Sequence, residues 1–175
     1  MTLAHRLYGA LRLDGAAYED VEADPTALVP AVAIVLAFGV AAAIGFADRT
    51  PNLGALVGAA GAALAGWLSW AAIVAYLGAR VFPEPQTRAD VGELARTLGF
   101  SAAPGLFMVL LAVPELRLAA FVAVSLWMLA AMVVAVRQAL DFTGTARAIG
   151  VCAAGWLLAG AFVLVAGFVF GSRLS

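Results

Sequence analysis

Charged residues divide the chain into five long runs that carry no charge. The runs lie between Asp24 and Asp48, Arg49 and Arg80, Arg96 and Glu115, Arg117 and Arg137, and Arg147 and Arg173. A helix needs about 20 apolar residues to cross a bilayer, and about 17 to 25 are acceptable. The pattern therefore predicts an all-α integral membrane bundle of five transmembrane helices, at 27–47, 54–79, 98–113, 117–137 and 148–171.

The third run is the shortest, and Pro104 interrupts it. Proline has no N–H to donate, and its ring crowds the preceding helical turn, so we expect a kink or break there. Two interpretations stay open for this run. It is either a bent helix that crosses the membrane or a re-entrant loop.

The segment before the first run is expected to lie on the cytoplasmic surface. At 2–13, Leu3, Leu7 and Leu11 share one helical face, while Arg6 and Arg12 lie on the opposite face. Such a pattern is typical of a helix that lies in the membrane interface. We therefore divide the chain into an N-terminal interfacial segment, 1–24, and a five-span membrane domain, 25–175.

A second amphipathic helix is predicted just before the third span. Val91, Leu94 and Leu98 fall on one face of it, and Thr87 is the expected N-terminal cap. Arg88 and Arg96 then point away toward water. We expect this helix and the N-terminal helix to form short interfacial helices on the cytoplasmic side.

Composition supports a bilayer as the solvent of this chain. Hydrophobic residues make up 65% and charged residues only 12%, and the mean hydropathy is +1.02. A soluble domain is about half apolar and about a quarter charged. The net charge of −1 argues against a nucleic-acid partner, which would require a basic patch. Membrane lipid is the partner that the composition indicates.

The second span carries small residues at every fourth position. These residues are Gly54, Gly58, Ala62 and Gly66. Small residues let a neighbouring backbone approach closely, which is how helices associate in lipid. The stripe therefore predicts a helix-packing face.

The distribution of arginines predicts the orientation. Seven lie on the side of the N-terminus and three on the other side, where Arg49, Arg117 and Arg173 are found. Positive residues are enriched in cytoplasmic loops, so the N-terminus is expected in the cytoplasm and the C-terminus outside. All ten basic residues are arginines, which suggests a GC-rich bacterial genome and hence the bacterial inner membrane.

A search for chemistry indicates that the protein is not an enzyme. His5 stands alone, Cys152 lies in an apolar helix without a charged neighbour, and no Asp, Glu, Lys or Arg interrupts any span. Proton relays and ion pathways normally need such residues inside the membrane. We therefore predict no catalytic residue, no cofactor and no metal site.

One short motif resembles a known family. Gly99, Phe100 and Pro104 are similar to the G-Y-x-x-x-P element of the Yip-domain family, the Ypt/Rab-interacting membrane proteins, with Phe in place of the usual Tyr. Asp24 and Pro25 stand near the D-L-x-G-P element of eukaryotic relatives. The order of segments is similar to prokaryotic members. The resemblance implies five spans, a cytoplasmic N-terminus and a link to trafficking in eukaryotes, but no established activity for bacterial relatives.

The function expected from these observations is that of a non-enzymatic scaffold, adaptor or accessory subunit. It would pack against or recruit another integral membrane protein. Arg88 and Arg96 are the candidate docking face, with Gly99 and Pro104 setting the angle of their helix to the bundle. The alternative is a small channel or transporter for an uncharged or lipidic solute.

Overall fold

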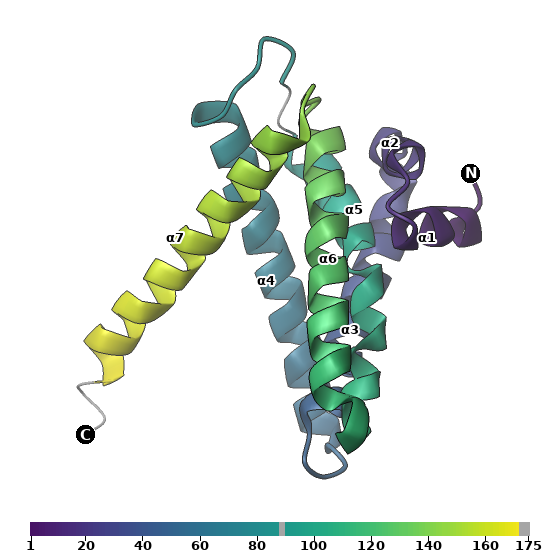
Figure 1. Ribbon diagram of the computed structural model, residues 1–175, viewed down its shortest axis with the longest axis vertical. Helices are drawn as coiled ribbons and strands as arrows, with labels where there is room; N and C mark the ends of the chain where they lie inside the picture. The colour runs from purple at the N-terminus through teal and green to yellow at the C-terminus, as the bar shows by residue number, and fades with distance from the viewer. Residues whose placement is uncertain (88–89, 172–175) are drawn as a thin grey trace.

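Five long helical segments build the body of the molecule, and two short helices pack against its side near one end (Figure 1). The computed structural model describes residues 1–87 and 90–171, with side chains as far as Leu158. The long segments are α3 (Leu28–Phe46), α4 (Leu53–Arg80), α5 (Val91–Ser101) continued by the 3₁₀ helix η2 (Ala103–Ala112), α6 (Arg117–Ala139) and α7 (Thr145–Gly171). The short elements are α1 (Leu3–Leu11), α2 (Gly15–Ala23) and the 3₁₀ turns η1 (Pro25–Ala27) and η3 (Pro114–Leu116).

Among the residues that the structure describes, four segments are long and apolar enough to cross a membrane. They are Pro25–Phe46, Leu53–Arg80, Val91–Ala112 and Pro114–Ala139. These segments coincide with the first four predicted spans and confirm a multi-pass membrane protein. In the last predicted span, the part of α7 with described side chains gives a shorter apolar helix, Thr145–Leu158.

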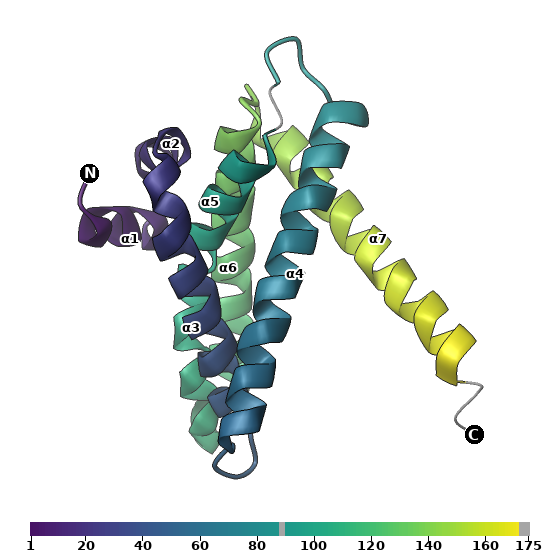
Figure 2. The same cartoon turned by 180° about the vertical axis from the view of Figure 1, so that it is seen from behind.

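The chain alternates between the two ends of the bundle. At one end, which we call the α2 end, Gln138 donates to Glu19 at 2.7 Å and Gln86 donates to the Asp141 carbonyl at 3.1 Å. At the opposite end, Arg117 pairs with Asp48 at 3.5 Å. Helix α7 starts at the α2 end and diverges from the other helices along its length, as the two views show (Figures 1 and 2).

The segment with Pro104 runs the whole length of the bundle. It begins near α2, where Arg96 bonds the Glu22 carbonyl, and it ends where Arg117 donates to the Leu111 carbonyl at 3.1 Å. The predicted break is confirmed, because the α-helix ends at Ser101 and η2 continues with Pro104 in its first turn. Its two ends lie at opposite ends of the bundle, which favours a bent helix that crosses the membrane over a re-entrant loop.

Glycines allow two of the helix pairs to approach closely. A Cβ atom on Gly39 of α3 would lie 2.8 Å from the Ala59 carbonyl oxygen and 2.9 Å from the Ala63 side chain of α4. A Cβ atom on Gly99 of α5 would lie 2.6 Å from that of Ala31 in α3. Helix α3 therefore packs against both neighbours at backbone distance, as membrane helices do at small residues.

Candidate functional site

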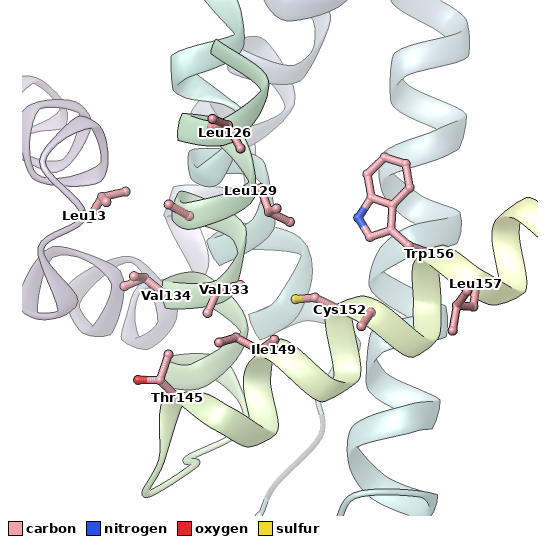
Figure 3. Close-up of a pocket in the computed structure, with 12 residues that line it drawn as sticks. Leu13, Leu126, Leu129, Val133, Val134, Thr145, Ile149, Cys152, Trp156 and Leu157 are labelled. Carbon is pink, nitrogen blue, oxygen red and sulfur yellow. The ribbon is translucent and has the colours of Figure 1, made fainter. Parts of the chain in front are cut away.

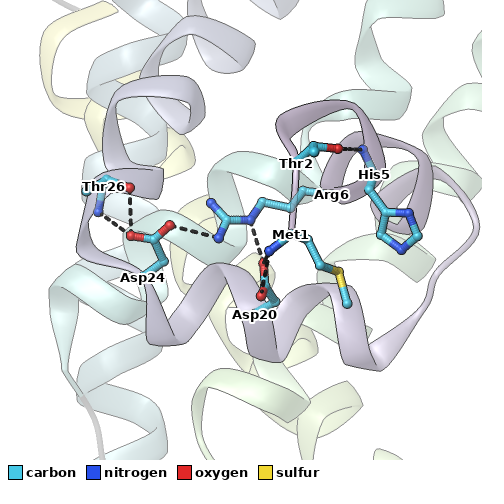
Figure 4. Close-up of polar contacts among 7 residues, drawn as sticks. All are labelled: Met1, Thr2, His5, Arg6, Asp20, Asp24 and Thr26. Carbon is cyan, nitrogen blue, oxygen red and sulfur yellow. Dashed lines mark hydrogen bonds and ion pairs between the residues drawn. The ribbon is translucent and has the colours of Figure 1, made fainter.

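The N-terminal helices are tied together by a buried arginine (Figure 4). Arg6 of α1 donates from Nε to Asp20 of α2 at 2.6 Å, and its Nη2 lies 2.7 Å from Asp24. The sequence pattern placed Arg6 on an outward polar face, and this is wrong, since only 8% of the residue is exposed. Two carboxylates from the following helix supply the hydrogen bonds that a buried guanidinium requires. Helices α1 and α2 therefore form one unit.

Asp24 joins this unit to the first span. Its Oδ1 accepts from the Thr26 backbone N–H at 2.9 Å and from the Thr26 hydroxyl at 2.6 Å (Figure 4). These hydrogen bonds, together with the one from Arg6, lower the pKa of Asp24 to about 2. Pro25 follows at the first position of η1, where a missing N–H costs nothing. Asp24 and Pro25 thus both help to form the turn before α3.

Helix α5 lies inside the bundle and is not a surface helix. Leu94, Thr97 and Phe100 are fully buried, as most of the helix is. Its N-terminal cap is Asp90, which accepts from the Glu93 N–H at 2.9 Å, whereas the hydroxyl of the predicted cap Thr87 accepts from the Glu84 N–H. The amphipathic pattern did not predict this burial, because the polar face of α5 also contacts other parts of the protein.

Arg96 does not face water as the sequence predicted. It is half-buried, and its Nη2 donates to the Glu22 carbonyl of α2, so it joins the N-terminal unit to α5. The carbonyl oxygens near the end of a helix have no partner within the helix, and Arg96 satisfies one of them. Arg88, the other half of the predicted docking face, lies outside the described residues.

The Gly99–Pro104 motif lies in the centre of the packing. Gly99 gives α5 its close contact with Ala31, and the side chains of Phe100 and Pro104 are fully buried. The neighbouring Gly105 closely approaches the ring of Phe38. The motif therefore sets how α5 and η2 pack against α3.

The small-residue stripe of α4 makes no close helix contact among the described residues of this chain, and its role as a packing face stays a prediction. A Cβ atom on Gly58 or Gly66 would meet no described atom within 4 Å, and one on Gly54 would meet only Asn52. Ala62 is exposed as well. The face of α4 that does contact α3 is the neighbouring one, with Ala59 and Ala63.

A polar cleft opens at the α2 end. It has a volume of about 460 Å³, and α2, the start of α5 and the end of α6 contribute to it. Its charged lining consists of the carboxylates of Glu19, Glu22, Glu93 and Asp141 and the guanidinium of Arg137. Burial, followed by the negative charges of Asp141, Glu93 and Glu19, raises the pKa of Glu22 to about 7. Carboxylates in such excess favour a positively charged ligand.

Metal-ligand side chains do not cluster among the described residues. No set of three or more His, Cys, Asp or Glu side chains there could hold a metal ion. His5 is exposed on α1 and Cys152 is buried in α7, far apart in the chain. What the α2 end offers is a polar surface of fixed shape.

A second set of contacts fixes the loops at this end. Glu84, in the loop after α4, accepts from the Thr143 N–H at 3.1 Å and pairs with Arg147 at 2.9 Å. The Thr143 N–H, followed by its hydroxyl, lowers the pKa of the Glu84 carboxyl. The N-terminal unit, the loop after α4 and the loop before α7 thus form one connected polar surface.

Comparison with known proteins identifies one matching family. No curated protein and no solved structure matches it. A family model described as the Yip1 domain matches residues 8–169, nearly the whole chain, and this range includes α2, Asp24, Pro25 and the Gly99–Pro104 motif. The resemblance seen in the motif is therefore confirmed, and the chain belongs to the Yip1 domain family.

Proposed function

We propose that this Yip1-family membrane protein is a non-enzymatic adaptor that recruits another integral membrane protein through its α2 end. The observation that carries the proposal is the polar cleft between α2, α5 and α6, with its four carboxylates and one arginine. A cleft of this charge fits a basic segment at the membrane surface of a partner protein. Its walls are held in place beforehand, which reduces the entropy cost of binding.

The rigidity of the cleft follows from three contacts between different elements. Gln138 of α6 holds Glu19 at 2.7 Å, Arg96 of α5 holds the backbone at Glu22, and Arg6 fixes α2 through Asp20. Each contact joins elements that are distant in sequence. The docking surface proposed here is therefore the cleft, in place of the outward face of the α5 helix.

The proposal includes five spans, a cytoplasmic α2 end and location in a bacterial inner membrane. Helix α7 has 27 residues, and at 1.5 Å per residue it is about 40 Å long, enough to cross a bilayer. With α7 crossing, the C-terminus would lie outside. Arginines concentrate at the α2 end, which supports its cytoplasmic placement.

Affinity purification of the chain from its native membrane in mild detergent tests the adaptor role. Glu19→Gln combined with Glu22→Gln removes two carboxylates from the cleft while keeping side-chain size. We expect recovery of the partner to fall by about tenfold, as loss of paired charges predicts, and high salt to have the same effect on the unmodified protein.

Asp48→Asn is the matched control, because this carboxylate is exposed at the opposite end of the bundle. It should leave recovery unchanged. Equal recovery of the same membrane proteins by the wild type and the double variant would show that the cleft does not dock a partner.

A further inference from the structure

The divergence of α7 leaves a large apolar groove between α6 and α7 (Figure 3). The groove has a volume of about 860 Å³, within the range of small-molecule sites. Leu126, Leu129 and Val133 of α6 form one wall, and Ile149, Cys152 and Trp156 of α7 form the other. Apart from the Thr145 hydroxyl and the Cys152 thiol, its lining side chains are hydrocarbon or aromatic.

A second apolar cavity lies beside the groove and is enclosed by more helices. It measures about 520 Å³ and is lined from α3, α4, α5, η2, α6 and α7. Leu129 and Trp156 line both spaces, so the groove and the inner cavity meet at these two side chains. Trp156 packs on Trp70 with ring centroids 5.8 Å apart, which holds α7 to α4 at the junction.

The shape and lining of these spaces indicate which molecule fills them. Apolar cavities do not hold water well, and an empty one loses dispersion contacts on every side. A partner helix is about 10–12 Å across with its side chains, so it could cover the outer groove but could not enter the inner cavity. A flexible hydrocarbon chain could occupy both.

The residue types also favour a hydrocarbon chain over a helix. Helix interfaces in membranes are enriched in small residues that let backbones approach. On α4, exposed small residues with no close neighbour are found at Gly58 and Gly61, whereas the groove presents mainly branched and aromatic side chains. Side chains of that kind give a large, irregular contact area suited to an acyl chain.

The groove has a polar end and an apolar end. Thr145 lies at the end where α7 begins, near the polar loops, and Leu126 and Trp156 lie farther along the spans (Figure 3). A lipid with its head group level with the polar surface of the α2 end would direct its chain along the groove toward Trp156.

We infer that the α6–α7 groove and the inner cavity together form a binding site for one acyl chain of a bilayer phospholipid. The site is separate from the polar cleft and stands whether or not the cleft recruits a partner. Recognition is of the chain, so different head groups should bind alike. Bound lipid would fill the space that the divergence of α7 leaves beside α6.

Native mass spectrometry of the delipidated full chain in mild detergent tests this site. Phosphatidylglycerol and phosphatidylcholine are titrated separately, and we expect one lipid of either kind to bind more tightly than the next. Ala130→Phe and Ala153→Phe each place a ring in the groove from opposite walls. Each should weaken binding of the first lipid by about tenfold.

Ala123→Phe is the matched control, since Ala123 is exposed on α6 and does not line the groove. It should bind lipid like the wild type. A phosphatidylcholine with a diazirine in its acyl chain should label 126–134 and 149–157 in the wild type and lose that label in both groove variants.

Two results would overturn the inference. One is binding and labelling that are the same in all variants, which would mean contact with bulk lipid only. The other is a wild-type mass of two chains that the groove variants convert to one, which would assign the groove to a second copy of the chain.

Discussion

At the scale of single residues, charges determine how the N-terminal unit is held. Arg6 and Arg96 both looked like outward-facing arginines in the sequence, and both make contacts between elements in the structure. Each is satisfied by oxygen atoms that helical periodicity cannot place: the carboxylates of Asp20 and Asp24, and the carbonyl of Glu22. Local patterns describe which faces differ in polarity but not what each face meets.

Glu22 should make the stability of the protein depend on pH. Its pKa rises from 4.5 to about 7 because burial, and then the carboxylates of Asp141, Glu93 and Glu19, disfavour its charged form, while Arg96 opposes this. A carboxyl with a raised pKa in the folded state binds more protons folded than unfolded. Stability is therefore greatest below the unfolded pKa and falls as pH rises toward the folded pKa.

Glu22→Gln should remove this dependence. We expect the wild-type unfolding temperature in detergent to fall between about pH 5 and pH 8 and the variant to change less over that interval. Glu115→Gln, at the opposite end of the bundle, is the control. A variant whose unfolding curve follows the wild type at every pH would mean that Glu22 is ionised in the folded protein without penalty.

At the scale of elements, hydropathy predicted the helices and small residues determined their contacts. The first four spans were predictable because a bilayer demands long uncharged runs, and Pro104 marked the break because its ring cannot fit an α-helix. The packing face of α4 was not predictable. Gly54, Gly58 and Gly66 offered a regular stripe, yet Ala59 and Ala63 lie on the face that meets α3. A helix rich in Ala and Gly has several possible packing faces, and only its partner selects among them.

Substitutions on the two faces of α4 should separate packing within the chain from packing between chains. Ala63→Leu adds volume against Gly39, where the helices already touch, and should destabilise the fold by about 1–3 kcal/mol. Gly58→Leu adds volume where the described chain has no contact and should leave the unfolding free energy nearly unchanged. Titration with a denaturing detergent measures the unfolding free energy of both variants.

Gly99→Val belongs to the same series and tests the family motif. Its Cβ would lie 2.6 Å from that of Ala31, so we expect a loss similar to that of Ala63→Leu. If Gly58→Leu proves as damaging as the other two, the stripe packs against something that the single chain does not contain. In that case the stripe would serve as a contact with a second protein.

At the scale of the whole molecule, polar and apolar parts are separated along the long axis of the bundle. The N-terminal unit, the loop after α4 and the loop before α7 share one end and are joined by hydrogen bonds such as that from Gln86 to the Asp141 carbonyl. The opposite end has short turns at 47–52 and 113–116. Six of the described arginines lie toward the α2 end, namely Arg6, Arg12, Arg80, Arg96, Arg137 and Arg147, and two, Arg49 and Arg117, lie at the other.

This asymmetry predicts the topology in the membrane. Because arginines near span ends are retained in the cytoplasm, a fluorescent reporter at the N-terminus or in the loop after α4 should fold in the cytoplasm. Alkaline phosphatase fused after Ser175 should be active outside, since α7 is long enough to cross. Asp48→Arg with Thr50→Arg adds positive charge to the α3–α4 turn and should produce a fraction of inverted molecules. Matched reporters that place both termini on the same side would mean that α7 does not cross, because the four preceding segments traverse the bundle in alternation and return the chain to the α2 end.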